Sequence, residues 1–264
     1  MADRDPRRRR ESFDTVAALY ERYRPGYPDE VVRGVIDAGG LTAESRVLEI
    51  GCGTGQLSVP LARLGLTLQA VELGRELAAI AARNLRPYPR ASVAVAAFED
   101  WPLPPRPVDA VVCANAWHWL DPDVRFTKAA AALRAGGALV IVHVHHVPRA
   151  NLQFFRDTNK VYIRWDLSSD PSWLPPTARA LRAMYPEIEL SEAFTAVRRR
   201  RVPWTQDFTT SAYVGMLRTD SLMLGMPASD REGFLEEIAG LIDSRHGGKV
   251  AWHFVYEIVS AIRS

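Results

Sequence analysis

The stretch that decides the fold is VLEIGCGTGQL, at residues 47–57. Its first four residues are apolar apart from Glu49 and are typical of a buried strand, and a helix is predicted to follow over residues 56–64. Three glycines lie between the strand and the helix at alternate positions, namely Gly51, Gly53 and Gly55. Glycines let the backbone turn tightly and approach a ligand, and open α/β sheets bind ligands where a strand passes into a helix.

The spacing of the glycines distinguishes between classes of ligand. A dinucleotide-binding turn follows GxGxxG, which requires a glycine at position 56, but the residue there is Gln56. A carboxylate at Glu49 would repel a pyrophosphate and attract an ammonium or sulfonium group. Glu72 ends the next predicted strand, where a carboxylate can accept hydrogen bonds from both hydroxyls of a ribose. These residues indicate an adenosine with a cationic tail and disfavour an oxidoreductase.

Strands and helices alternate on both sides of this turn. Strands are predicted over residues 46–50, 66–72, 92–97, 108–113 and 138–144, and helices over residues 56–64, 75–84 and 123–134. Gly136 and Gly137 are expected to cap the last of these helices. Strands that are apolar on both faces and separated by helices indicate an α/β fold with a parallel sheet covered on both sides.

The regions that flank this alternation have a different character. A helix that begins at Ser12 is expected to stop near Arg24, because two prolines and a glycine follow, and a second helix is predicted over residues 29–37. Residues 148–190 are rich in aromatic residues and prolines and are predicted to form a cap of two helices. Beyond them, one helix and two strands are predicted over residues 230–242, 193–204 and 250–261. The two strands are expected to pair antiparallel at the sheet edge.

Composition and charge exclude several classes of protein. The chain has 264 residues, of which 47% are hydrophobic and 24% charged, so it is long enough to bury a sizeable core without disulfides. Its net charge is +2, but the first ten residues carry five arginines against two aspartates, so the other 254 residues sum to −1. Such a nearly neutral body disfavours nucleic acid as the partner.

Targeting and cysteine patterns point to the cytoplasm, and a composition rich in Ala and Arg with only three lysines indicates a bacterial source. The chain has no run of about 18 apolar residues, and no apolar segment follows the N-terminal charges. Neither a membrane span nor a secretion signal is therefore expected. Cys52 and Cys113 lie too far apart for a CxxC site and are expected to be free thiols.

Residues 47–57, together with Glu72, resemble the first motif and the acidic ribose residue of class I S-adenosylmethionine-dependent methyltransferases. The resemblance extends over roughly residues 12–147. It implies a Rossmann-like, doubly wound sheet of seven mostly parallel strands, with an antiparallel last strand and a helical cap inserted after the fifth. Two further segments, YERYRPGYP at residues 20–28 and WHWLD at residues 117–121, resemble bacterial small-molecule methyltransferases similar to the trans-aconitate methyltransferase group.

Composition and patterning, together with this resemblance, predict how the chain is divided. Residues 1–10 are expected to form a disordered basic arm, and residues 11–264 a single methyltransferase domain. Within that domain we expect N-terminal helices over the cofactor, a cofactor-binding core, a helical cap, and closing strands and helices, over residues 11–40, 45–146, 148–190 and 193–264 respectively.

The resemblance also implies, by position, which residues hold the cofactor. The glycine turn would face its methionine part, the end of the 66–72 strand its ribose and the end of the 92–97 strand its adenine, while the segment after the fourth strand would close the floor near the sulfonium. The N-terminal helix would cover the cofactor, with Arg24 near its carboxylate. The expected contacts are Tyr20, Arg24, Glu49, Gly51, Gly53, Gly55, Gln56, Glu72, Leu73, Phe98, Glu99, Asn115 and Ala116.

The acceptor is expected where the fourth strand ends. Methyl transfer requires the acceptor to be aligned opposite the leaving sulfur, and His118 follows that strand with an ordinary pKa suited to a general base. A packing role for its imidazole beside the tryptophans is the alternative. The histidines that end the fifth strand are expected to line the pocket rather than to bind a metal. The expected substrate contacts are Tyr23, Trp117, Trp119, His143, His145, His146, Trp165 and Trp173.

The predicted function is transfer of a methyl group from S-adenosylmethionine to a small, aromatic or apolar acceptor, with S-adenosylhomocysteine as the other product. The protein is expected to act as a monomer or homodimer without a membrane or nucleic acid. RNA or DNA methylation is an alternative because of the basic run at residues 198–201, although no Asn/Asp-Pro-Pro-aromatic motif follows the fourth strand. The second alternative is a cyclase or a regulator that binds the cofactor but transfers no methyl group.

Overall fold

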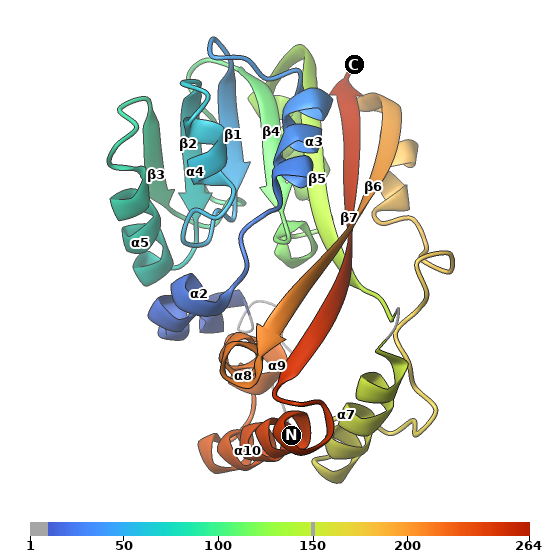
Figure 1. Cartoon of the computed structure of the whole chain (residues 1–264). Coiled ribbons are helices and arrows are strands. Elements are labelled where there is room, and N and C mark those ends of the chain that lie inside the picture. The colour runs from blue at the N-terminus through green and yellow to red at the C-terminus, as the bar shows by residue number, and fades with distance from the viewer. Residues whose placement is uncertain (1–9, 149–150) are drawn as a thin grey trace. The chain divides into compact units, whose positions relative to one another are not determined.

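A seven-stranded sheet organises the chain in the order β3-β2-β1-β4-β5-β7-β6 (Figure 1). The structure is a computed structural model that describes residues 10–148 and 151–264. The strands are β1 (Arg46–Ile50), β2 (Thr67–Glu72), β3 (Ala91–Val95), β4 (Val108–Ala114), β5 (Leu133–His146), β6 (Phe194–Thr209) and β7 (Lys249–Arg263). Strands β1 to β5 pair in parallel, and β7 runs in the opposite direction. The predicted mostly parallel sheet with an antiparallel last strand is confirmed.

Helices fill most of the connections between these strands. The α-helices are α2 (Ala17–Tyr23), α3 (Asp29–Gly39), α4 (Ser58–Ala62), α5 (Arg75–Leu85), α6 (Arg125–Ala132), α7 (Leu152–Arg164), α8 (Thr210–Leu217), α9 (Ser221–Leu224) and α10 (Ala228–Arg245). Three short 3-10 helices are η1 (Ser12–Val16), η2 (Trp117–Trp119) and η3 (Pro186–Leu190). The predicted basic arm at residues 1–10 lies outside the described residues except for Arg10.

The order of the strands reverses between β1 and β4. Strands β1, β2 and β3 follow one another in one direction across the sheet, whereas β4 and β5 continue in the other. The connections that leave the carboxyl ends of β1 and β4 therefore diverge, and this divergence is where open α/β sheets bind their ligands. The glycine turn at residues 51–55 follows β1 directly, so the fold places it at this position.

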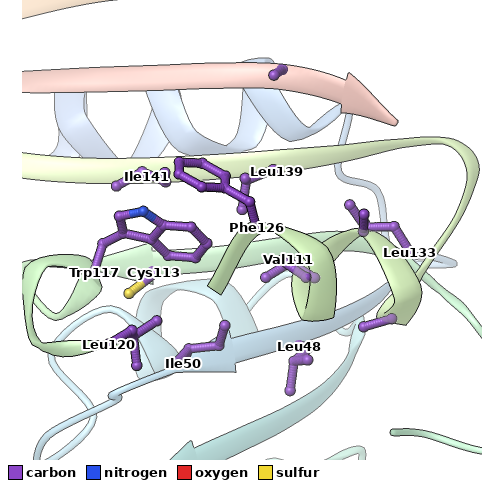
Figure 2. Close-up of a cluster of buried hydrophobic side chains, with 14 of the residues drawn as sticks. Leu48, Ile50, Val111, Cys113, Trp117, Leu120, Phe126, Leu133, Leu139 and Ile141 are labelled. Carbon is purple, nitrogen blue, oxygen red and sulfur yellow. The ribbon is translucent and has the colours of Figure 1, made fainter. Parts of the chain in front are cut away.

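The core beside this position is built around Trp117 and Phe126 (Figure 2). Their rings meet edge to face, with centroids 5.1 Å apart, between apolar side chains of β4 and β5. Side chains of β1, β4 and β5 complete the cluster, including Leu48, Ile50, Val111, Cys113, Leu133, Leu139 and Ile141. Most residues of β1 and β4 are buried, so the segments that follow these strands begin at the packed core.

The chain divides into two compact units. We call the first the sheet unit; it contains residues 25–144, 183–202 and 256–264. The second, which we call the helical unit, contains residues 145–182 and 203–255 with the described residues up to 24. In the helical unit, α10 packs against α7 and α8, and α2 packs against α8. The prediction of a single methyltransferase domain over residues 11–264 stays a prediction.

Several predicted boundaries are wrong, and each has a physical reason. The glycine pair at residues 136–137 does not cap α6, because α6 ends at Ala132 and β5 begins at Leu133, which is fully buried and pairs with Val108. Helix α4 starts at Ser58, two residues after the predicted start at residue 56. The late strands β6 and β7 are neighbours at the sheet edge, as predicted.

The described residues of the cap predicted over residues 148–190 form one α-helix and the short 3-10 helix η3 rather than two α-helices. The insertion after β5 forms α7, but residues 165–185 contain no helix. This stretch carries Pro171, Pro175 and Pro176, which remove backbone donors and clash with the preceding turn of a helix. Aromatic and proline content therefore indicated an insertion correctly, but it did not specify its secondary structure.

The close packing of β5 predicts a stability difference between two glycine substitutions. A Cβ at Gly137 would lie 2.9 Å from the carbonyl oxygen of Arg134 and 3.0 Å from that of Asp109, whereas a Cβ at Gly26 would meet nothing within 4 Å. We expect Gly137→Ala to lower the free energy of unfolding by about 1–3 kcal/mol, and Gly26→Ala to leave it nearly unchanged. Denaturant titrations of both variants check this, and equal midpoints would contradict it.

Candidate cofactor and acceptor site

The glycine turn after β1 adopts a backbone that other residues rarely adopt. Gly51, Gly53 and Gly55 have φ angles of 67°, 59° and 100°, in the left-handed region that favours glycine. A Cβ at Gly51 would overlap the side chain of Ala116, which follows β4. Glycine is therefore the only residue type that fits at position 51. The contact of Gly51 with Ala116 fixes the turn against the end of β4.

Glu72 at the end of β2 is held by two backbone donors. Its Oε2 accepts a hydrogen bond from Gly53 N at 2.8 Å, and its Oε1 accepts one from Gly74 N at 3.0 Å. The residue is 8% exposed. Because each carboxylate oxygen can accept more than one hydrogen bond, the fixed carboxylate can also receive hydroxyl donors.

Glu49 is a second buried carboxylate, only 1% exposed. Its pKa is raised to about 8, mainly by burial; a hydrogen bond with the Ser58 hydroxyl opposes this rise, and the nearby charge of Glu72 adds to it. Its Oε2 has no hydrogen-bond partner among the residues that the structure describes. A buried carboxylate oxygen without a donor fits a cationic ligand such as an ammonium group, which would supply both a hydrogen bond and a charge.

The other expected cofactor residues in the sheet unit have roles within the protein. Gln56 braces the turn, because its Nε2 donates to Thr54 Oγ1 at 2.6 Å and its Oε1 accepts from Thr54 N at 3.2 Å. Phe98 is 2% exposed and belongs to the core cluster. Glu99 Oε1 accepts a hydrogen bond from Asp121 N at 3.1 Å, and Leu73 is half-buried after β2. Their contacts with a cofactor stay predictions.

Asn115 fastens the end of β4 to its neighbours. Its φ angle is 55°, which is uncommon for a residue other than glycine. Its Oδ1 accepts from Val144 N at 2.9 Å, and its Nδ2 donates to the Tyr27 hydroxyl at 3.1 Å. The sequence had placed Tyr27 within a motif but had not indicated this contact.

The residues after β4 separate into core and surface. Trp117 is fully buried in the core cluster (Figure 2), and its Nε1 has no hydrogen-bond partner among the described residues. Its ring packs against Phe126, and its expected contact with a substrate stays a prediction. His118 is exposed and its ring lies 4.8 Å from that of half-buried Trp119.

His118 and His143 are brought together from β4 and β5. Their ring centroids are 5.9 Å apart with an interplanar angle of 82°. The hydroxyl of Tyr185 lies 3.3 Å from His143 Nδ1, and burial is the main cause that raises the pKa of this tyrosine above its ordinary value. No local pattern indicates the contact between Tyr185 and His143, because Tyr185 lies 42 residues beyond His143 in a region predicted as cap.

The remaining expected residues belong to the helical unit, where each has partners of its own. Arg24 Nε donates to Thr219 Oγ1 at 2.8 Å and lies over the ring of Tyr20, and the Tyr23 ring lies against Gly215. His146 Nδ1 accepts a hydrogen bond from Trp252 Nε1, and Trp165 Nε1 donates one to Glu237. Half-exposed Trp173 lies in a loop, and His145 lies near the end of β5. The ligand contacts of Tyr20, Tyr23, Arg24, His145, His146, Trp165 and Trp173 stay predictions.

The described residues contain neither a metal-binding cluster nor a membrane-spanning helix. No group of three or more His, Cys, Asp or Glu side chains within residues 10–148 and 151–264 is arranged to hold a metal ion. Within the same ranges, no helix combines the length and the apolar character needed to cross a membrane. Both cysteines, Cys52 and Cys113, are buried and unpaired.

The burial of Glu49 predicts a pH dependence of stability. Its folded-state pKa of about 8 exceeds the ordinary value of 4.5, so the folded protein holds the proton more tightly than the unfolded chain. The stabilising contribution is therefore fully present below about pH 4.5 and is lost as the pH rises to about 8. Relative to Glu49→Gln, the wild type should lose about 1.4 kcal/mol for each pH unit within this window.

Thermal or denaturant unfolding of both proteins between pH 5 and pH 8, at about one-unit steps, measures this difference. The matched control is Glu44→Gln, which removes an exposed carboxylate and should show no such trend. A difference between wild type and Glu49→Gln that is constant with pH would contradict the burial argument.

Comparison with known proteins agrees with this arrangement. Residues 47–137 match the family model of a methyltransferase domain. An uncharacterized methyltransferase of Mycobacterium tuberculosis is 31% identical over 231 residues, which are 88% of this chain and 85% of the relative. A ubiquinone biosynthesis O-methyltransferase of Xanthomonas campestris is 34% identical over 109 residues, 40% of this chain and 46% of the relative.

Among solved structures, a putative type II methyltransferase from Anaeromyxobacter dehalogenans has the same fold, with a TM-score of 0.62 at 24% identity, over 91% of this chain and 97% of that one. Three observations indicate the same family. They are the glycine turn at the end of β1, the fixed carboxylate at the end of β2 and the extended similarity to the mycobacterial relative. The chain belongs to the class I S-adenosylmethionine-dependent methyltransferases.

Proposed function

We propose that this enzyme binds S-adenosylmethionine at the carboxyl ends of β1 and β2 and transfers its methyl group to a small-molecule acceptor at the ends of β4 and β5. The observation that carries this proposal is the pair of buried carboxylates beside the glycine turn. Glu72 is fixed by two backbone donors, and Glu49 has an oxygen without a partner among the described residues. One suits a ribose and the other a cation, and an adenosine with a cationic tail contains both.

Each part of the site has a distinct task in this proposal. Glu72 accepts the ribose hydroxyls, because Gly53 N and Gly74 N already hold its oxygens in place. Glu49 receives the ammonium group of the methionine part, and the charge of that group favours the ionised carboxylate. The glycine turn leaves room for the ligand because it carries no side chains at Gly51, Gly53 and Gly55.

The cofactor supplies a methyl group on a sulfonium sulfur, which leaves as the neutral thioether of S-adenosylhomocysteine. The chain's own residues align the acceptor and keep water away, and in the best intramolecular systems such positioning contributes about 7–11 kcal/mol. His118 accepts the proton of the acceptor. The side chain of His118 is exposed beside Trp119, so its imidazole is accessible to an acceptor, whereas the side chain of Trp117 is buried.

A small acceptor suits the charge distribution better than a nucleic acid does. The basic run at residues 198–201 is largely neutralised by neighbouring groups: Arg199 pairs with Glu189 at 3.2 Å, Arg200 with Glu30 at 3.3 Å and Arg201 with Glu257 at 3.3 Å. Paired arginines offer little charge to phosphates. The similarity to a ubiquinone biosynthesis O-methyltransferase supports a small acceptor as well.

Binding of S-adenosylhomocysteine tests the cofactor site. We expect the wild type to bind it and Gly51→Ala to bind at least tenfold more weakly, since a Cβ would collide with Ala116 and displace the turn. Gly65→Ala is the matched control, because Gly65 also has a positive φ angle, of 80°, yet a Cβ there would meet nothing within 4 Å. Isothermal titration calorimetry measures all three affinities, and thermal melting verifies that each variant is folded.

Tight binding of NAD without binding of S-adenosylhomocysteine would overturn the proposed cofactor. Equal weakening by both glycine variants would show that the collision with Ala116 is not the cause.

The role of His118 has its own test. His118→Ala should lower kcat by about 10²–10⁴-fold while the affinity for S-adenosylhomocysteine stays within about twofold of the wild type. Release of S-adenosylhomocysteine with a methylated acceptor measures turnover. Turnover near the wild-type rate would assign His118 to packing beside Trp119 instead.

A further inference from the structure

His146, the last residue of β5, is bound to Trp252 of β7 within the helical unit. Its Nδ1 accepts a hydrogen bond from Trp252 Nε1 at 2.5 Å, and the two ring centroids are 5.3 Å apart at an interplanar angle of 82°. Directly after His146, Val147 N donates to the carbonyl oxygen of His253 at 3.1 Å. A side-chain contact and a backbone contact therefore fix His146 beside β7.

The tautomer of His146 follows from its hydrogen bond with Trp252. An indole N–H can only donate, so the imidazole nitrogen that receives it must be unprotonated. A neutral imidazole carries a single hydrogen, which then lies on the other nitrogen, Nε2. His146 therefore presents one N–H donor, and the position of that donor is determined.

The surroundings of His146 keep its imidazole neutral. Burial lowers its pKa to about 4; the charge of Asp220 opposes this shift, and the charges of Arg24 and His145 add to it. The side chain is nonetheless exposed, so protein surrounds the ring without covering all of it. Nε2 has no hydrogen-bond partner within residues 10–148 and 151–264. The donor can therefore be reached by a ligand.

Aromatic rings hold both members of this pair. The ring centroid of Trp252 lies 5.0 Å from that of Tyr213 and 5.3 Å from that of Phe155, and Trp252 is 8% exposed. The ring of buried Phe254 lies 5.4 Å from that of His146. The environment of the imidazole is therefore apolar as well as fixed.

This environment disfavours an isolated charge beside His146. The imidazole loses water to the surrounding protein, which opposes its cationic form, and a charged ligand group at Nε2 would lose water in the same way. Asp220 would also repel an anion, and its Oδ1 already accepts from Leu222 N at 2.9 Å. Arg24 donates to Thr219 Oγ1 at 2.8 Å. A neutral oxygen can accept the Nε2 hydrogen without the cost of burying a charge.

We infer that His146 binds a neutral oxygen of the methyl acceptor through its Nε2–H. This inference rests on the proposed function, which locates the acceptor at the ends of β4 and β5. It narrows the substrate to uncharged aromatic or apolar compounds that carry a carbonyl or ether oxygen besides the atom that is methylated. His146 determines specificity and accepts no proton, because its Nδ1 is occupied by Trp252. Trp252 is a positioning residue, since it acts through His146.

The first test requires no ligand. Nitrogen-15 NMR of labelled histidine side chains reports the tautomer of His146, and the signal is identified by its loss in His146→Gln. We expect the Nε2–H tautomer in the wild type, neutral from about pH 8 down to about pH 5. An Nδ1–H tautomer in the wild type would overturn the inference, whether or not any variant folds.

The same spectra test the positioning role of Trp252. Trp252→Phe keeps an aromatic ring but removes the indole N–H, so we expect a mixture of His146 tautomers. Trp204→Phe is the matched control, because it removes the N–H of a 41% exposed tryptophan in the same unit and should change nothing. An unchanged His146 tautomer in folded Trp252→Phe would overturn the positioning role.

The second test compares three phenols that differ only at the para position. The compound para-hydroxyacetophenone carries a neutral carbonyl oxygen there, para-ethylphenol carries no oxygen there, and para-hydroxybenzoate carries a charged carboxylate. Isothermal titration calorimetry measures their affinities with and without S-adenosylhomocysteine, and the shift of the His146 Nε2 signal locates the binding. We expect the ketone to bind about fivefold more tightly than the ethyl compound, and the carboxylate to bind most weakly.

Two substitutions of His146 test the donor itself. His146→Phe keeps a ring without an N–H, so the ketone and the ethyl compound should bind equally, whereas His146→Gln keeps a donor and should retain part of the preference. Thermal melting verifies that both variants are folded. Equal binding of the ketone and the ethyl compound by the wild type, tighter binding of the carboxylate, or no shift at His146 with any of the three would overturn the inference.

Failure of this inference differs from failure of the proposed function. Absence of S-adenosylhomocysteine binding by the wild type contradicts the proposed function, while the preference for the ketone is still measured without the cofactor. Binding of S-adenosylhomocysteine together with a preference for the carboxylate leaves the proposed function standing and contradicts only the neutral-oxygen assignment.

Discussion

The close approach of Gly51 to Ala116 is the constraint on which the site depends. The two residues leave the carboxyl ends of β1 and β4, where the order of the sheet reverses, and only a glycine fits at position 51. This contact holds the turn after β1 against the segment that leads to His118. The binding of an adenosine and the chemistry at an acceptor are thereby linked through backbone geometry rather than through a flexible side chain.

The same region concentrates groups that cost folding energy. A buried carboxylate oxygen without a donor at Glu49 is unfavourable, as are left-handed backbones at Asn115 and Tyr185. Contacts hold the two strained backbones: Val144 and Tyr27 bind the Asn115 amide, and the backbone of Met184 is anchored before Tyr185. Their location beside the reversal of the sheet is consistent with a site that is organised before its ligands bind.

Local patterns predicted the cofactor half of the sheet well. Strand β1 occupies the predicted residues 46–50, because a short apolar run before a glycine turn has few alternatives. The contact between Tyr185 and His143 had no local signal, because it depends on how distant segments pack. The burial of Trp117 had no local signal either, because the sequence alone did not distinguish it from its more exposed neighbours His118 and Trp119.

The most direct measurement is a crystal structure of the enzyme with S-adenosylhomocysteine. The account predicts that both ribose hydroxyls lie within hydrogen-bonding distance of the Glu72 carboxylate and that the ammonium group lies on Glu49. It also predicts that Gly51 and Ala116 stay in contact. A nucleoside bound elsewhere in the protein, or one whose ribose does not touch Glu72, would contradict the central claim.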